Sequence, residues 1–98
     1  PIYAAAVVLA AEGYPARARA GDEISGLEQA EALEGVTVCH AGTRLGEDQR
    51  VYTAGGRVLA VCATGLSLRE ALERAYRGVS SVRFAGLQFR RDIGGRAP

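Results

Sequence analysis

An unbroken run of apolar residues near the start of the chain predicts a β-strand over residues 3–11. Such a run is typical of a strand that is buried on both faces, although its alanine content also fits a short helix. The run stops at Glu12-Gly13-Tyr14-Pro15, where glycine accepts a positive φ and proline lacks a ladder donor. We therefore expect a loop there, followed by an irregular segment over residues 16–35 with one short helical turn at residues 27–33.

Three further runs, residues 36–40, 51–53 and 57–63, are rich in β-branched and small apolar residues and predict more strands. Ala54-Gly55-Gly56 lies between the second and third runs, and its two glycines suit the positive φ of a tight hairpin. The segment Gly46-Glu47-Asp48-Gln49 has the composition of a similar turn one strand earlier. We expect these strands to form an antiparallel meander.

A helix over residues 67–81 is the clearest local prediction. Ser67 and Glu70 have the spacing of a capping box, in which each side chain accepts a hydrogen bond from the other residue's backbone N–H. Apolar residues then recur at intervals of three and four and mark one buried face: Leu68, Ala71, Leu72, Ala75, Val79 and Val82. The charged residues of the helix are expected in water: Arg69, Glu73, Arg74 and Arg77. Gly78 is expected to weaken the last turn.

The chain closes with residues 82–84 and 87–89, which predict two short strands around Gly86. Together the elements predict an α+β fold, with a mainly antiparallel β-sheet bent into a small barrel-like sandwich and one packed α-helix. The chain has 98 residues, 48% of them hydrophobic and 23% charged, which fits one folded domain over residues 1–98. Because it begins with proline instead of methionine, we expect it to be a piece of a longer chain.

Composition excludes several classes of function. All twelve basic residues are arginine, so a Walker-type phosphate loop and Schiff-base catalysis, which both need lysine, are excluded from this chain. A net charge of +1 is too small for a nucleic-acid partner. No apolar stretch approaches the roughly 20 residues of a membrane-spanning helix, and no leader precedes the first strand, so we expect no membrane partner and a cytoplasmic location.

Two places could bind a ligand. His40 is the single histidine and ends a predicted strand, where a loop could present it, although the residues alone favour a structural or merely exposed histidine. In Gly55-Gly56-Arg57 the glycines would let a ligand approach the backbone beside an arginine fork that can bind phosphate or carboxylate. An ordinary hairpin tip is the alternative for this segment.

The C-terminal tail holds Arg90, Arg91 and Asp92, and it is either a solvated tail or an ordered segment in which Asp92 orients an arginine. The other carboxylates are scattered without a pair that predicts metal or glycosidase chemistry. Cys39 and Cys62 lie in separate apolar runs, so buried free thiols are expected in preference to a disulfide or a metal site. The residues alone therefore predict no catalytic residue and no metal ligand.

Four motifs in fixed order give the sequence a family resemblance. The chain resembles the C-terminal domain of the phosphoribosylamine-glycine ligase family, which belongs to the ATP-grasp ligases of purine biosynthesis. The resemblance covers nearly the whole chain and rests on these segments: Leu9-Ala10-Ala11-Glu12-Gly13-Tyr14-Pro15, His40-Ala41-Gly42-Thr43, Gly55-Gly56-Arg57-Val58-Leu59-Ala60-Val61 and Phe89-Arg90-Arg91-Asp92-Ile93-Gly94. It departs from the family at residues 16–19, where glycine and an aromatic are usual, and at Phe89 and Arg91, where tyrosine and lysine are usual.

This resemblance implies a reaction that joins glycine to 5-phosphoribosylamine. ATP activates the glycine carboxylate as an acyl phosphate, the amine attacks it, and glycinamide ribonucleotide, ADP and phosphate are formed. Mg²⁺ or Mn²⁺ bridges the nucleotide phosphates in the full-length enzyme. The family's ATP and metal sites lie upstream of this region, so we expect this fragment to bind neither and to be inactive alone. Its partners would be the N-terminal and ATP-grasp domains of the same ligase.

The resemblance also implies roles for individual residues. Arg57, next to Gly55 and Gly56, is the best candidate for a contact to the phosphate or ribose of the substrate. His40 and Thr43 are candidates for lining the cleft. The tail residues Arg90, Arg91 and Asp92 are candidates for substrate contact or for docking against the other domains. The competing hypothesis is a freestanding, non-catalytic module that binds a phosphorylated metabolite or a protein partner.

Overall fold

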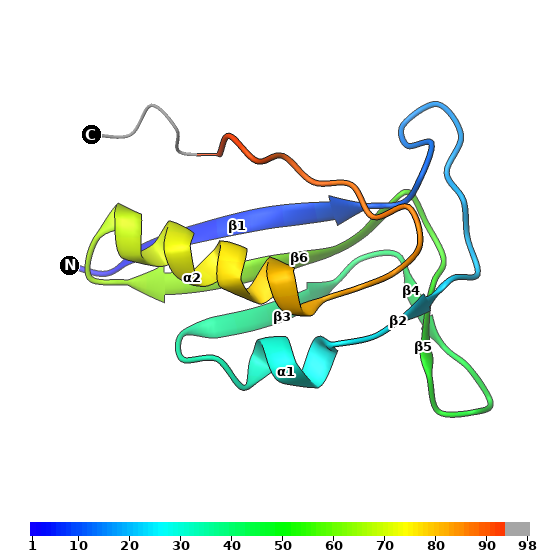
Figure 1. Cartoon of the computed structure of the whole chain (residues 1–98), viewed down its shortest axis with the longest axis horizontal. Coiled ribbons are helices and arrows are strands. Elements are labelled where there is room, and N and C mark those ends of the chain that lie inside the picture. Colours follow the sequence, from blue (N-terminus) through cyan, green and yellow to red (C-terminus); the bar gives the residue numbers. More distant parts are fainter. Residues whose placement is uncertain (94–98) are drawn as a thin grey trace.

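The computed structural model describes residues 1–93 and consists of two small antiparallel sheets and two helices (Figure 1). The main sheet has the order β1-β6-β3, with β1 at Tyr3–Ala10, β6 at Arg57–Gly65 and β3 at Val36–His40. The minor sheet has the order β2-β5-β4, with β2 at Glu23–Ile24, β5 at Val51–Thr53 and β4 at Thr43–Leu45. The helices are α1 at Leu27–Glu31 and α2 at Leu68–Ser81. None of the helices described is long and apolar enough to cross a membrane.

The core lies between α2 and one face of the main sheet. Figure 1 shows α2 running along β1 and β6 on that face. Val7 and Leu9 of β1 are paired with Val61 and Leu59 of β6, and all four side chains are almost completely buried. Fully burying one such side chain stabilises the fold by about 1.5 to 3 kcal/mol, so this cluster is the main source of stability.

Helix α2 begins as the sequence predicts. The Ser67 hydroxyl accepts from the backbone N–H of Glu70 at 3.1 Å. The Glu70 carboxylate turns back and accepts from the N–H of Leu66 at 2.7 Å, one residue earlier than the expected Ser67. Both bonds satisfy backbone donors that the helix itself leaves free, which fixes the point where the chain leaves β6.

Gly78 has a role that its helix propensity does not indicate. It is buried in α2, and a Cβ atom added there would lie 2.7 Å from Val61 Cγ1 and 3.0 Å from Val36 Cγ1. The missing side chain therefore lets the helix lie directly on β6 and β3. The expectation that Gly78 simply weakens the last turn misses this packing function.

The α+β prediction is confirmed, but the strand order differs from the expected meander. β3 pairs with β6, whereas β5 belongs to the minor sheet with β2 and β4, and residues 1–93 form no closed barrel. Ala54-Gly55-Gly56 is consequently not a hairpin tip but the link that carries the chain from one sheet to the other. Local β-propensity identifies strands without identifying their partners, which explains the error.

Two further expectations are corrected. β1 is buried on one face only, since Val8 remains 45% exposed between the buried Val7 and Leu9. The two closing strands are absent from the described residues: the segment makes isolated bridges, Ser25 with Arg83 and Ala10 with Gln88. Each bridge lies beside a different strand, so the pairing does not extend into a ladder. The predicted helical turn at residues 27–33 is confirmed as α1.

Gly78→Ala provides a test of this packing. In an exposed helix the change would stabilise by about 1 kcal/mol through helix propensity, but here the added methyl overpacks the contact with Val61 and Val36. We expect a loss of about 1 to 3 kcal/mol in the free energy of unfolding, measured by urea denaturation. Ser80→Ala, at an exposed position of the same helix, is the matched control and should be neutral or mildly stabilising. A gain in stability for Gly78→Ala would contradict the packing described.

Candidate functional site

A surface hollow of about 680 Å³ is lined by four of the eight residues that the sequence analysis selects, namely His40, Gly55, Gly56 and Arg57. Its lining includes Val8, Cys39 and Ala60, which lie on the face of the main sheet turned away from α2. Two loops with the strand ends beside them also line it, namely residues 41–42 after His40 of β3 and residues 54–56 before Arg57 of β6. The antiparallel pairing of β3 with β6 brings these loops together, because the end of one strand lies beside the start of the other.

Backbone contacts hold the two loops against each other. The N–H groups of Ala41 and Gly42 donate to the carbonyl of Val58 at 3.0 and 2.9 Å, and Ala54 N–H donates to the Gly42 carbonyl at 2.7 Å. A Cβ atom on Gly42 would lie 2.6 Å from the carbonyl oxygen of Arg57 and 2.9 Å from Gly55 Cα. Glycine at position 42 is therefore required for the close approach of the loops.

Arg57 lines the hollow with its side chain exposed. Within residues 1–93 no carboxylate lies within ion-pair distance of its guanidinium. An arginine without an acidic partner keeps its five N–H donors available, and it can bind a phosphate or carboxylate in a bidentate manner. This is the strongest chemical feature of the hollow.

His40 and Thr43 are joined by a hydrogen bond of 2.9 Å between Nδ1 and Oγ1. His40 is the last residue of β3 and lines the hollow, while Thr43 begins β4 and is not part of the lining. The bond fixes the orientation of the imidazole ring, which leaves Nε2 free for another contact. Within residues 1–93 no carboxylate is hydrogen-bonded to this pair, and we interpret the pair as a binding group.

Tyr14 also lines the hollow, and the sequence analysis does not select it. A Cβ atom on Gly56 would overlap the Tyr14 ring, so the second glycine of the motif leaves the space that the aromatic side chain occupies. The ring is 37% exposed. Tyr14 lies in the loop that follows β1, and its peptide bond to Pro15 is cis. The sequence did contain a signal for Tyr14, namely an aromatic residue between glycine and proline in the first of the four family motifs.

The structure does not bring Arg90, Arg91 and Asp92 to this hollow. Arg90 Nε and Nη2 donate to the Asp92 carboxylate at 3.1 and 3.0 Å, and this contact lowers the pKa of Asp92. The Tyr76 hydroxyl of α2 donates to the Arg90 carbonyl at 2.7 Å, while the Arg91 guanidinium lies 4.5 Å from the centre of the Phe89 ring. The tail is thus ordered along α2 up to residue 93, and Gly94, Gly95 and Arg96 lie outside the described residues.

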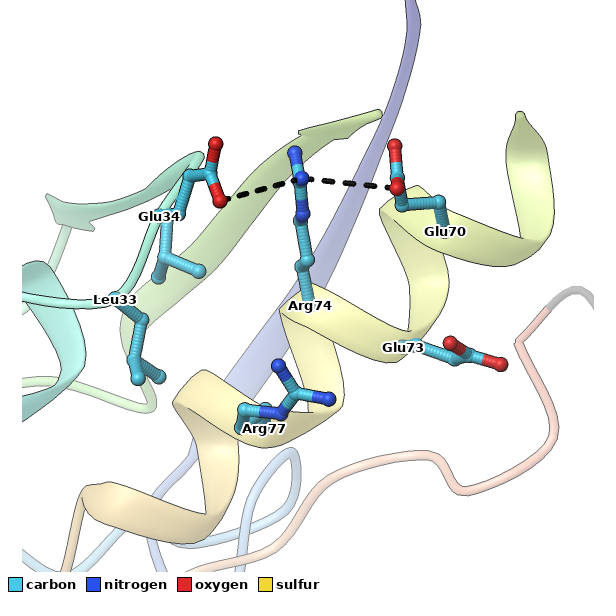
Figure 2. Close-up of a pocket in the computed structure, with 7 residues that line it drawn as sticks. Leu33, Glu34, Glu70, Glu73, Arg74 and Arg77 are labelled. Carbon is cyan, nitrogen blue, oxygen red and sulfur yellow. Dashed lines mark ion pairs between the residues drawn. The ribbon is translucent and has the colours of Figure 1, made fainter. Parts of the chain in front are cut away.

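A second hollow, of about 200 Å³, lies between α2 and the turn before β3 (Figure 2). Arg74 Nη2 lies 3.7 Å from the Glu34 carboxylate and 3.6 Å from that of Glu70, and its Nη1 donates to the Thr64 carbonyl at 2.7 Å. The Arg74 side chain is only 23% exposed, which corrects the expectation that it lies in water. Because these partners satisfy its donors, we interpret this arginine as a structural clamp.

The two cysteines differ from the expected buried thiols. Both are free, but Cys39 is exposed and Cys62 is half-buried, with 3.7 Å between their Sγ atoms. Burial, followed by the hydrogen bond to Cys39, raises the pKa of the Cys62 thiol. No group of three or more histidine, cysteine or acidic side chains within residues 1–93 could hold a metal ion, so the described residues do not fit a metal site.

Comparison with known proteins identifies the family. The family model described as phosphoribosylglycinamide synthetase, C domain, matches residues 4–96. The chain belongs to this family. A phosphoribosylamine-glycine ligase of Synechocystis is 54% identical over 94 residues, which are 96% of this chain and 22% of that protein. The ligase of Salmonella typhimurium is 50% identical over 91 residues, or 93% of this chain and 21% of the relative.

A solved structure agrees with the family assignment. The crystal structure of phosphoribosylamine-glycine ligase from Thermotoga maritima matches with a TM-score of 0.78 and 38% sequence identity, over 91% of this chain and 21% of that chain. This domain of the phosphoribosylglycinamide synthetase family therefore spans about a fifth of the length of the ligases that it matches. The resemblance based on four motifs is confirmed, and so is the α+β fold.

The contact between the two loops can be tested with two glycine-to-alanine variants. Gly42→Ala places a methyl group against backbone atoms that cannot move independently, whereas a Cβ on Gly55 meets only Gly42 Cα at 3.4 Å. We expect Gly42→Ala to lower the free energy of unfolding by about 1 to 3 kcal/mol. Gly55→Ala should be neutral or stabilising by up to about 1 kcal/mol, because it restricts the unfolded chain. Equal effects of the two variants in thermal denaturation would contradict the close approach at Gly42.

Proposed function

We propose that this chain is the C-terminal domain of a phosphoribosylamine-glycine ligase, which joins glycine to 5-phosphoribosylamine and consumes ATP. The observation that carries the proposal is the match of residues 4–96 to the C-domain family, together with relatives of that name that are about half identical to this chain. Residues 1–98 are then one domain of a chain about five times as long, and its partners are the N-terminal and ATP-grasp domains of that chain. A cytoplasmic location is part of the same proposal.

The hollow beside Arg57 supplies the substrate contact in this proposal. Its guanidinium is available and lies next to the backbone of Gly55, so it suits the phosphate of phosphoribosylamine. His40 offers a ring nitrogen for a ribose hydroxyl and is held in place by Thr43. Arg90, Arg91 and Asp92, which lie along α2, are better suited to docking against another domain than to binding the same substrate molecule.

The activation step belongs to other parts of the ligase. ATP would phosphorylate the glycine carboxylate with Mg²⁺ or Mn²⁺ on the nucleotide phosphates, and the amine of phosphoribosylamine would then displace phosphate from the acyl group. The described residues offer no metal ligand cluster for that step. The contribution of this domain is to hold the phosphoribosyl end of the nucleophile. The binding energy of the phosphoribosyl group then fixes the amine in place, and this raises the rate of its attack.

Arg57→Ala in the full-length ligase tests the assigned contact. Loss of a charge-assisted hydrogen bond costs about 1.5 to 3 kcal/mol, so kcat/KM for phosphoribosylamine should fall about 10- to 100-fold. The KM for ATP should change by less than about twofold, because the nucleotide does not touch this side chain. Arg69→Ala, on the exposed side of α2, is the control and should leave both constants unchanged. A fall in kcat/KM for ATP as large as the fall for phosphoribosylamine would contradict the role of Arg57.

The size of the native polypeptide tests the proposal as a whole. An antibody against residues 1–98 should detect a protein about five times as long, as the relatives predict, with ATP-grasp peptides in its mass spectrum. The isolated chain should not convert ATP to ADP when glycine and phosphoribosylamine are supplied. A native protein of the size of this chain would favour the freestanding binding module instead.

A further inference from the structure

One face of the main sheet has no cover within residues 1–93. The helices α1 and α2 both pack on the other side, as Figure 1 shows for α2. The strand register places six small apolar residues next to one another on the uncovered face, which we call the outer face: Ala4, Ala6, Val8, Cys39, Ala60 and Cys62. Thr37 and Thr64 also lie on the outer face, toward the end of the sheet away from Arg57. Four of the six are exposed, Val8 to 45%, and the other two are half-buried.

This composition is unusual for a sheet face in water. An antiparallel sheet with one solvated face normally carries polar residues there, in alternation with apolar residues on the core side. Here the core-side residues Val7 and Val61 alternate with Ala6, Val8, Ala60 and Cys62 on the outer face, so both sides are apolar over this part of β1 and β6. Contiguous exposed apolar surface of this kind marks an interaction site.

We propose that the outer face is the surface by which this domain packs against the remaining part of the same ligase chain. The proposal rests on the proposed function, because the matched ligases extend about four-fifths of their length beyond the region that this chain covers. Alanine and cysteine side chains are short, so a second layer of chain can approach the sheet closely. An interface within one chain typically buries 600–1,500 Å², in the range that a three-stranded sheet face can offer.

The outer face is continuous with the substrate hollow. Val8, Cys39 and Ala60 belong to both, and Arg57 with the two glycines stands at the same end of the sheet. Docking on the outer face would therefore place the rest of the ligase over the side of the hollow that is now open. The hollow would become a cleft between domains, where small-molecule sites are commonly found.

The two thiols report whether the face is covered. In the isolated chain N-ethylmaleimide should alkylate the exposed Cys39 quickly and the half-buried Cys62 slowly, and this difference also shows that the chain is folded. In the native full-length ligase Cys39 should react more slowly by about tenfold or more, because it becomes accessible only when the interface opens. Trypsin cleaves after arginine, so residues 20–44 and 58–69 carry one cysteine each and mass spectrometry reads the two separately.

A matched pair of variants tests the cause of the protection. Ala6→Glu in the full-length ligase puts a charge in the middle of β1 on the outer face and should restore fast labelling of Cys39. Ala85→Glu changes an exposed alanine in the loop after α2 and should leave Cys39 protected. In the isolated chain Ala6→Glu should leave Cys39 the faster and Cys62 the slower of the two thiols, since position 6 is already in water there. The new carboxylate lies beside its cross-strand partner Cys62 and disfavours that thiolate, so it can only widen the difference.

Equal labelling of Cys39 in the isolated chain and in an active full-length ligase would overturn the proposed interface while leaving the proposed function in place. A different outcome would also overturn it. If Cys39 is protected in a concentrated solution of the isolated chain that has the mass of a dimer, but is not protected in the ligase, then a second copy of this chain covers the outer face. Loss of Cys39 protection with Ala6→Glu and not with Ala85→Glu would support the proposed interface. A native polypeptide no longer than this chain would instead remove the proposed function on which it rests.

Discussion

The packing of α2 on one face of the main sheet is the contact on which the other features depend. Ala71, Ala75 and Gly78 present almost no side chain to the sheet, so the helix axis comes close and the valines and leucines of β1 and β6 are enclosed. Dense packing of this kind gains dispersion energy in addition to the removal of apolar area from water. This packing also makes the two faces of the main sheet different. A chain of this size has one core, so the face under α2 is buried, and none of the described helices covers the other face.

The position of β6 in the centre of the main sheet determines where the candidate site forms. β6 starts at Arg57, and its antiparallel neighbour β3 ends at His40 beside it. The chain can reach this start only by crossing from β5 in the minor sheet, and Gly55-Gly56 makes that crossing under the Tyr14 ring. Substrate-binding candidates that are 17 residues apart in sequence, His40 and Arg57, are therefore neighbours because of strand pairing and not because of a shared loop.

Local signals predicted the elements well and their arrangement poorly. The cap at Ser67 and the three-to-four spacing behind it depend on nearby residues, so the sequence alone located α2. The partner of β6 depends on which faces are buried, and the apolar character of both faces of β1 removed the alternation that would have indicated this. The Arg57 motif was visible in the sequence through its glycines, whereas Tyr14 depends on a contact across 42 residues that no local pattern encodes.

Under the proposed function, the same reasoning explains how a phosphate contact matters to the reaction even where it supplies no catalytic group. Binding energy from a part of the substrate that does not react, such as a phosphate, lowers the barrier when it fixes the reacting atom in place. That requires a rigid anion contact, and the backbone bonds between the two loops, with Gly42 against Arg57, provide rigidity at the base of the guanidinium. A flexible side chain on a flexible loop would bind the phosphate but would not direct the amine. The glycines therefore matter for positional precision as much as for access.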